Sequence, residues 1–317
     1  MAPVEDIATR DAYGEELAAL ARADRNVVAL DCDLGRSTRS YAVAEVDPAR
    51  FVEMGIAEQD MISTAAGMAR MGKVVFVNSF AVFVTGHAFD QIRQQVALPK
   101  ANVKICGSSA GITQGTDGAT HQSVVDAALM RALPNMTVIV PADARQTREA
   151  VRAAYELAGP VYLRLSRLGT GDFLPADAAF QLGKAQELRS GGRVALVGCG
   201  PVLRNVLAAA DLLRDHHGLT VGVVNAHTLK PFDEAAIARL AVQYEQVFSV
   251  EEHSILGGLG SAVAESLAEA RGQGRRAILT RLGLRDCFGE SGSAQELLRK
   301  HGLDAEGIAK SVLEAVR

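Results

Sequence analysis

The sequence is poor in the cysteine patterns that mark disulfide-rich or zinc-binding proteins. Its four cysteines, Cys32, Cys106, Cys199 and Cys287, are widely spaced along 317 residues, and no Cys-x-x-Cys pair occurs. Disulfide frameworks and structural zinc sites use close or regularly patterned cysteines. The scattered thiols therefore favour reduced cysteines and a cytoplasmic location.

The sequence also lacks a charge excess and long hydrophobic runs. Its 33 basic and 37 acidic residues give a formal net charge of −4, which offers no general attraction to nucleic acid or to an anionic membrane. The first residues, MAPVEDIATRDAYGEEL, contain no apolar signal core, and no apolar run approaches the roughly 18 residues of a membrane span. We therefore expect no nucleic-acid partner and no membrane partner.

What the chain does contain is an alternation of short β-branched runs with longer segments of helical period. Strands are expected at 27–31, 74–78, 103–106, 137–140, 161–165, 193–198, 220–225, 246–251 and 277–282. Helices are expected at 58–71, 86–98, 122–132, 143–158, 202–215, 233–241 and 259–270, with two more at the C-terminus. This alternation is typical of α/β folds in which helices flank a mainly parallel or mixed sheet.

A stretch rich in glycine and polar residues interrupts this alternation near the middle of the chain. It includes LGTGDFLPADAAFQLGKAQELRSGG, which has the composition of a connection between domains. We therefore expect two α/β domains, at 1–170 and 191–317, joined by a linker at 171–190.

One glutamate, Glu58, begins an otherwise apolar helical stripe. At helical period, positions 58, 61, 62, 65, 66 and 69 hold Glu, Met, Ile, Ala, Ala and Ala. A buried carboxylate is unfavourable unless it is paired, protonated or used in chemistry. A carboxylate in the first turn of a helix is also favoured by the helix dipole, so spacing alone leaves a structural role and a proton-transfer role open.

The glycine-rich stretch GSSAGITQGTDGATHQ, residues 107–122, is a second candidate for a site. Its glycines let the backbone approach a ligand or another subunit closely, and loops that follow strands carry the sites of α/β sheets. Asp117 and His121 lie four residues apart in this stretch, and we expect His121 to open the next helix. Composition leaves open whether Asp117 only caps that helix and His121 is a surface residue.

Aromatic residues form only 5% of the chain, yet three phenylalanines fall within SFAVFVTGHAFDQIR, residues 79–93. Phe80, Phe83 and Phe89 fit either a place in the core or an apolar wall against a planar heterocycle. Arg10 and Arg167 lie at expected element ends, where phosphate-binding groups are often found. Taken singly, each arginine equally fits a solvated surface position.

In combination, these motifs resemble the C-terminal half of transketolase, and more specifically the separate second subunit of a split transketolase. In the first domain the resemblance rests on GIAEQDM, NSFAVF, AFDQIR, GTDGATHQ, RALPNMTVIVPAD and GPVYLRLSR. In the second it rests on GCGP, LKPFD and VEEHSILGGLGSAVAE. It extends over essentially the whole chain and implies a thiamine-diphosphate pyrimidine-binding domain followed by a transketolase C-terminal domain.

The resemblance also implies a cofactor and partners. The family binds thiamine diphosphate between two chains or domains, one of which holds the diphosphate through a divalent metal such as Mg²⁺. The family's metal-binding segment begins Gly-Asp-Gly, but here Gly171-Asp172 is followed by Phe173. This chain is therefore expected to supply the pyrimidine side and no metal ligand. A separate N-terminal-type subunit would hold the metal, and self-association through the pyrimidine-binding domain would give an α2β2 heterotetramer.

Roles for individual residues follow from the same resemblance. Glu58 would face the pyrimidine N1′ atom and share its proton. Phe80, Phe83 and Phe89 would pack at or near the pyrimidine ring, and Asp33 would lie close to the cofactor.

The remaining matched positions concern the substrate. His121 and Asp117 would lie near the substrate hydroxyls, where they would act in proton transfer and orientation. Arg10, Ser37 and Arg167 would hold the phosphate of a sugar phosphate.

The implied reaction is transfer of a two-carbon ketol unit from a ketose phosphate to an aldose or aldose phosphate. Ser109 stands where transketolases usually have a histidine, and this departure leaves the donor and the acceptor open. The alternatives are the β subunit of a 2-oxo-acid dehydrogenase complex, the equivalent part of 1-deoxyxylulose-5-phosphate synthase, and a non-catalytic paralogue of the same fold.

Overall fold

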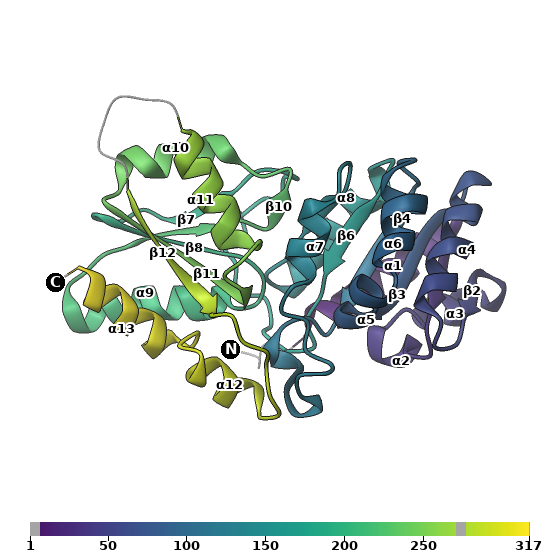
Figure 1. Ribbon diagram of the computed structural model, residues 1–317, viewed down its shortest axis with the longest axis horizontal. Coiled ribbons are helices and arrows are strands. Elements are labelled where there is room, and N and C mark those ends of the chain that lie inside the picture. Colours follow the sequence, from purple (N-terminus) through teal and green to yellow (C-terminus); the bar gives the residue numbers. More distant parts are fainter. Residues whose placement is uncertain (1–6, 271–276, 317) are drawn as a thin grey trace.

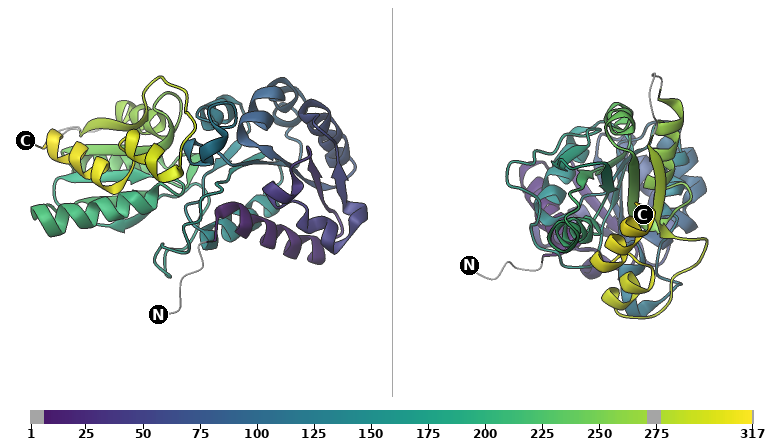
Figure 2. Two further views of the ribbon diagram at one scale, coloured as in Figure 1. Left: turned by 90° about the horizontal axis from the view of Figure 1, so that it is seen from below. Right: turned by 90° about the vertical axis from the view of Figure 1, so that its left-hand side faces the viewer.

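Two α/β domains lie side by side in the computed structural model, which describes residues 7–270 and 277–316 (Figure 1). In these ranges the first sheet has the strand order β10-β5-β6-β4-β3-β1-β2, and the second has the order β12-β11-β8-β9-β7. Pairing is parallel except at β10 with β5 and at β7 with β9. The expected fold class, with helices flanking mainly parallel or mixed sheets, is confirmed, and Figure 2 shows the arrangement from two further sides.

The first domain is built mostly from the first half of the chain. Its strands are β1 (Val27–Asp31), β2 (Phe51–Glu53), β3 (Val74–Phe80), β4 (Val103–Ser108), β5 (Thr137–Ile139) and β6 (Val161–Arg164). Its α-helices are α1 (Thr9–Ala23), α2 (Gly35–Thr38), α3 (Ala42–Val46), α4 (Glu58–Arg70), α5 (Ala81–His87), α6 (Phe89–Gln91), α7 (Asp126–Ala132) and α8 (Ala144–Glu156). Shorter helical turns are η1 (Pro48–Arg50), the π-helical η2 (Ile92–Ala97) and η3 (Ile112–Asp117).

The second domain follows the same alternation. Its strands are β7 (Gln186–Arg189), β8 (Val194–Gly198), β9 (Gly222–Asn225), β11 (Gln246–Ser254) and β12 (Ile278–Leu284). Its helices are α9 (Leu203–His217), α10 (Glu234–Gln243), α11 (Leu259–Glu269), α12 (Ala294–Lys300) and α13 (Ala305–Ala315). The remaining strand, β10 (Thr228–Lys230), leaves this domain and pairs with the edge of the first sheet.

Alternating side chains divide the apolar core between the two faces of the first sheet. In β1, Val27 and Ala29 pack with α1 and α8, whereas Val28 and Leu30 pack with α4 on the other face. This alternation follows from the two-residue period of a strand, and burial on both faces explains why the strand is apolar throughout. The apolar cluster that contains Val28 and Leu30 continues into the second domain, where it includes residues of β8, α10 and α11. One apolar cluster therefore spans both domains.

Several elements differ from the pattern expected from the sequence. The helix expected at 86–98 is wrong in its bounds, because α5 begins directly after β3 at Ala81 and the following segment is π-helical. Strand β7 lies inside the segment expected to be a linker, and β10 has only three residues. Strands this short carry too little hydrophobic period to be recognised in a sequence.

A buried ion pair of the first domain, Arg164 with Asp126, also contacts the second domain. Arg164 of β6 donates from Nε to Asp126 Oδ2 at 2.8 Å, and Tyr162 donates to the same oxygen at 2.6 Å. Arg164 Nη2 also donates to the backbone oxygen of Glu252 in β11 at 2.9 Å. The Arg164 guanidinium lies close enough to hold the pKa of Asp126 below its usual range against the opposing effect of burial.

Among the helices of residues 7–270 and 277–316, none is both long enough and apolar enough to cross a lipid bilayer.

Candidate functional site

The candidate site lies at the edge of the first sheet where β1, β3, β4 and β6 end. These four strands are mutually parallel neighbours, so their carboxyl ends meet at one edge, which is the usual site position in open α/β sheets. Asp33, Phe80, Ser109 and Arg167 each lie at or within three residues of the end of one of these strands. Topology thus gathers predicted site residues that are far apart in the sequence.

Glu58 is the first residue of α4, and only 4% of its surface is exposed. Ser79, near the end of β3, donates a hydrogen bond to Glu58 Oε1 at 3.0 Å. The second carboxylate oxygen lies 3.5 Å from Nδ1 of His87, which is itself largely exposed. The expectation of a buried carboxylate at the head of the apolar stripe is therefore confirmed. Ser79 is a site residue that sequence reasoning missed, because nothing in its sequence context distinguishes it from a core serine.

A group of aromatic rings adjoins this carboxylate through His87. Phe80 and Phe83 are stacked with their centroids 5.9 Å apart, and His87 stacks on Phe83 at 5.5 Å. His121 meets Phe83 edge-on at 5.3 Å and Phe80 at 6.2 Å. The structure thus brings Phe80, Phe83 and His121 together with Glu58. Flat apolar rings beside a carboxylate suit a planar heterocycle that can share a proton.

Phe89 and the 107–122 stretch depart from this grouping. Phe89 packs against the apolar core, and among the described residues no ring contact joins it to the aromatic group. His121 does not open a helix as expected, because it lies in a turn and α7 begins only at Asp126. Asp117 does not cap that helix, since Val125 occupies the N-cap position.

A second group of polar residues lies at the same edge of the sheet. Arg10, in the first turn of α1, donates from Nη1 to the backbone oxygen of Ser37 at 3.1 Å, and its backbone N–H donates to Ser166 O at 3.2 Å. Arg167 follows Ser166 and lies 3.2 Å from Asp117 Oδ2. The three predicted phosphate-binding residues are therefore neighbours, and Asp117 is placed among them.

The electrostatics of Arg10 favour an anion. Burial lowers the pKa of Arg10 from its usual value, and the positive charges of Arg39 and Arg167 lower it further, while Asp11 opposes them. The buried Arg10 Nε also has no hydrogen-bond partner within the described ranges. A partly desolvated guanidinium with a free donor, repelled by other cations, is stabilised by a negatively charged ligand.

The turn that carries Asp33 and Ser37 is held by a different aspartate. Asp33 itself is exposed at φ 61°, and its role near a cofactor stays a prediction. Asp31 is fully buried and accepts hydrogen bonds at 2.7 Å from Leu34 N and from the hydroxyls of Thr38 and Ser40. Burial raises the pKa of Asp31 to about 6, although these bonds oppose the shift.

Two buried hydroxyls without partners complete the edge. Ser109 adopts φ 55°, and neither its hydroxyl nor that of Ser108 has a hydrogen-bond partner in the parts of the chain that the structure describes. Buried polar groups are normally paired, so unpaired hydroxyls at a site are available to a ligand.

The site carries no ready-made set of metal ligands. Within 7–270 and 277–316, no cluster of three or more His, Cys, Asp or Glu side chains is arranged to bind an ion. The site residues of this chain instead offer an aromatic wall, a carboxylate and a cationic group.

Comparison with known families identifies this arrangement. The family model described as "Transketolase, pyrimidine binding domain" matches residues 5–171, and the one described as "Transketolase, C-terminal domain" matches residues 183–308. The chain belongs to the transketolase family, as its sequence motifs predict.

Its relatives include chains of similar length. A putative transketolase C-terminal section from Methanocaldococcus jannaschii is 43% identical over 97% of this chain and 96% of its own length. One of the subunits of an apulose-4-phosphate transketolase from Phocaeicola vulgatus is 37% identical, with 98% of both chains covered. By contrast, the match to human transketolase covers 97% of this chain but 49% of that protein.

A solved structure agrees in fold with the whole chain. It is described as "Split gene transketolase, inactive beta4 tetramer", and it matches with a TM-score of 0.88, 43% identity and 98% coverage of both chains. The chain is therefore a transketolase-family subunit of the split type.

Proposed function

We propose that this chain is the pyrimidine-binding subunit of a thiamine-diphosphate-dependent transketolase, which moves a two-carbon ketol unit from a ketose phosphate to an aldose or aldose phosphate. The observation that carries the proposal is the meeting of two groups at one sheet edge. The first is Glu58 with its aromatic wall, and the second is the cationic group of Arg10 and Arg167. A ring-binding group beside an anion-binding group suits a heterocyclic cofactor next to a phosphorylated substrate.

Within this proposal, thiamine diphosphate supplies the nucleophilic carbon and the electron sink for carbon–carbon bond cleavage and formation. Glu58 holds the proton shared with the pyrimidine N1′ atom, and Ser79 fixes the orientation of its carboxylate. Phe80 and Phe83 form the wall for the pyrimidine ring. Asp33 and Phe89 lie near the cofactor in this proposal, although no described contact joins either of them to the Glu58 group.

The remaining predicted residues act on the substrate. Arg10, Ser37 and Arg167 bind its phosphate, while His121 and Asp117 orient and protonate or deprotonate its hydroxyls. The Asp117–Arg167 contact at 3.2 Å links the two tasks, because a phosphate that binds Arg167 competes with Asp117 for the same guanidinium.

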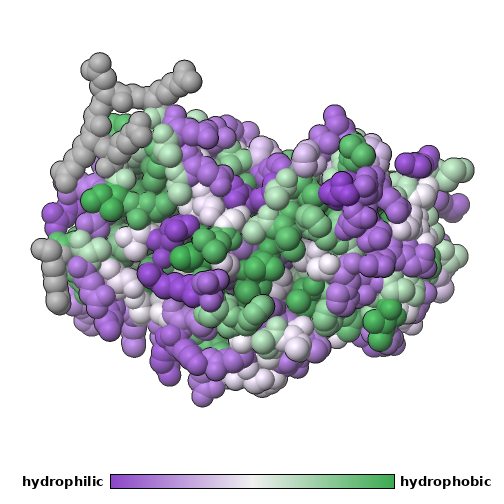
Figure 3. All heavy atoms as spheres, viewed as in Figure 1, coloured by the Kyte–Doolittle hydropathy of each residue, from purple (hydrophilic) through white to green (hydrophobic). Residues whose placement is uncertain are grey.

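A separate N-terminal-type subunit completes the enzyme in this proposal and holds Mg²⁺ or another divalent metal with the diphosphate. Support comes from relatives of similar length, one described as a C-terminal section and the other as one subunit of a transketolase. Self-association of this chain, which an α2β2 assembly requires, is supported by the inactive beta4 tetramer described for the similar split-gene protein. Self-association also agrees with the exposure of apolar side chains such as that of Ile56, which lies two residues before Glu58 and is 82% exposed. Figure 3 shows further apolar residues on the surface around the junction of the two domains.

The test is an assay of the purified chain mixed with its partner subunit, thiamine diphosphate and Mg²⁺. We expect ketol transfer from a ketose phosphate to an aldose phosphate, and no turnover when either subunit is omitted. Activity on a 2-oxo acid without activity on any ketose donor would instead favour the β subunit of a 2-oxo-acid dehydrogenase. Inactivity on both would favour a non-catalytic paralogue.

A further inference from the structure

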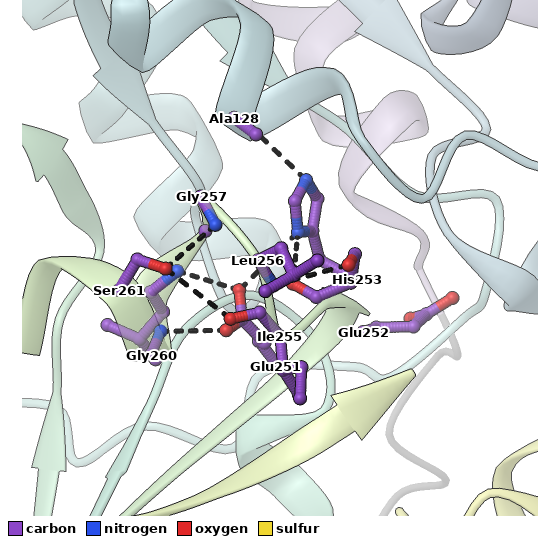
Figure 4. Close-up of polar contacts among 12 residues, drawn as sticks. Ala128, Glu251, Glu252, His253, Ile255, Leu256, Gly257, Gly260 and Ser261 are labelled. Carbon is purple, nitrogen blue, oxygen red and sulfur yellow. Dashed lines mark hydrogen bonds and ion pairs between the residues drawn. The ribbon is translucent and has the colours of Figure 1, made fainter. Parts of the chain in front are cut away.

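The end of β11 presents three consecutive ionisable residues, Glu251, Glu252 and His253, in alternating directions. The Glu251 carboxylate accepts the backbone N–H groups of Leu259 and Gly260 at 2.7 Å and so caps the start of α11. Figure 4 shows Glu252 extending away from the Glu251–His253 pair. Successive side chains of a strand point to opposite faces, so Glu252 contacts a different element from Glu251 and His253.

Glu252 reaches across the domain boundary to the 107–122 stretch. Its Oε1 accepts hydrogen bonds from the backbone N–H of Thr113 at 2.6 Å and from the Thr113 hydroxyl at 2.7 Å. The side chain is buried, with 5% of its surface exposed. Gly111, at φ 82°, leaves the space that this carboxylate fills, and a Cβ atom there would collide with it. The loop is therefore shaped around a carboxylate from the second domain.

This contact leads directly to the candidate substrate site. The Thr113 hydroxyl lies 3.4 Å from that of Ser166, whose backbone oxygen accepts the N–H of Arg10. On the other side, Gln114 follows Thr113 and donates through its side chain to Asp117 Oδ2 at 2.5 Å. The Glu252 carboxylate thus holds Thr113, and Thr113 is linked to Arg10 through Ser166 and to Asp117 through Gln114.

The position of Glu252 is itself fixed. Its backbone oxygen accepts a hydrogen bond from Arg164 at 2.9 Å, and Arg164 is held by its buried pair with Asp126. Burial raises the pKa of Glu252, while Arg164 and the bonds from Thr113 oppose that change. A hydrogen-bonded carboxylate on a strand with a buried ion pair behind it is a rigid support rather than a mobile side chain.

We propose that Glu252 is a positioning residue that holds the substrate loop at 111–122 through Thr113, so that the second domain sets the geometry of the phosphate and hydroxyl contacts made by the first. The consequence for catalysis rests on the proposed function. The structural role, in which Glu252 holds the loop, is independent of the proposed function because it concerns contacts within this chain alone.

Hydrogen exchange of the chain, combined with kinetics of the reconstituted enzyme, tests this role. For Glu252→Ala we expect amide exchange across 111–122 to accelerate about 10-fold, because two hydrogen bonds are lost, with little change at 74–80. The KM for the ketose phosphate should rise about 10-fold for the same reason, while proton exchange at C2 of the bound cofactor stays near wild type. Glu252→Gln keeps an oxygen that accepts the two bonds from Thr113, so its exchange rate at 111–122 and its KM for the ketose phosphate should both stay near wild type.

Lys230→Met is the matched control. Lys230 also crosses to the first domain, where its ammonium donates to the backbone oxygens of Arg131 and Leu133, and none of the hydrogen bonds among the described residues joins it to the loop. We expect it to leave exchange at 111–122 unchanged. An equal acceleration in Lys230→Met, or none in Glu252→Ala, overturns the proposal.

A second pair of variants decides the question if Glu252→Ala does not fold. Thr113→Val removes the hydroxyl bond to Glu252 together with the contact with Ser166, but keeps the backbone N–H bond to Glu252. It should accelerate exchange about 3-fold, whereas Thr113→Ser keeps the hydroxyl and should behave as wild type. Equal exchange rates at 111–122 in Thr113→Val and Thr113→Ser would overturn the proposed role of Glu252. If the loop responds as expected but the wild-type enzyme shows no ketol transfer, the proposed function fails and the positioning role stands.

Discussion

Replacing Glu58 by glutamine in the reconstituted enzyme is expected to slow proton exchange at C2 of the bound thiamine diphosphate by ~10²- to 10⁴-fold, the usual contribution of a positioned proton-transfer group. The amide keeps the size of the side chain and can still accept the hydrogen bond from Ser79. It cannot hold a shared proton as a carboxylate does. Exchange is measured directly by NMR after mixing with deuterated water and acid quenching.

The matched control for this prediction is Asp60→Asn. Asp60 lies in the same first turn of α4 but is exposed, so it contributes to the helix dipole without belonging to the aromatic group. We expect its loss to leave C2 exchange within about 2-fold, in keeping with a dipole effect of about 0.3–1 kcal/mol that acts mainly on stability. Equal effects of the two variants would show that Glu58 acts only through the helix.

Replacing Arg167 by alanine is expected to raise the KM for phosphorylated substrates by about 10- to 100-fold, because a charge-assisted hydrogen bond contributes roughly 1.5–3 kcal/mol. The KM for the corresponding unphosphorylated sugar should change by less than about 3-fold, since no phosphate contact is lost. Arg167→Lys should lie between the two, because an ammonium keeps the charge but not the two-pronged geometry. Steady-state kinetics with a matched pair of sugars measure the difference.

Arg148→Ala is a suitable control for Arg167. Arg148 pairs with Glu15 on the surface of α8 and α1, and we expect no effect on either KM. Arg167→Ala would contradict the phosphate assignment if it raised the KM of both sugars equally. That result would point instead to displacement of Asp117, the other partner of this arginine.

Much of the fold follows from sequence patterns because its strands are apolar on both faces. The runs at 27–31 and 161–165 predict β1 and β6 closely, since both strands are buried along their whole length and most of their positions are apolar. β10 and β7 did not appear in the sequence pattern, because three- or four-residue edge strands are selected by the neighbouring strand rather than by their own period. Likewise, the start of α5 at Ala81 depends on packing across the sheet edge.

The sequence allows the residues of the candidate site to be predicted better than their arrangement in space. A carboxylate on an apolar stripe marked Glu58, and its burial is confirmed. Arg10 and Arg167 are 157 residues apart in sequence, so only the parallel topology could bring them together. Ser79 and Glu252 gave no sequence signal of their own, because their roles depend on partners, Glu58 and Thr113, in other elements.

The central claim is that this chain carries one half of a cofactor site whose other half belongs to a separate subunit. Titration calorimetry with thiamine diphosphate and Mg²⁺ tests it most directly, on the chain alone and on its mixture with the partner. We predict binding to the chain alone to be at least about 100-fold weaker, because the diphosphate and metal contacts, about 3 kcal/mol or more, are missing. Tight, Mg²⁺-dependent binding of thiamine diphosphate to the chain alone would contradict the claim.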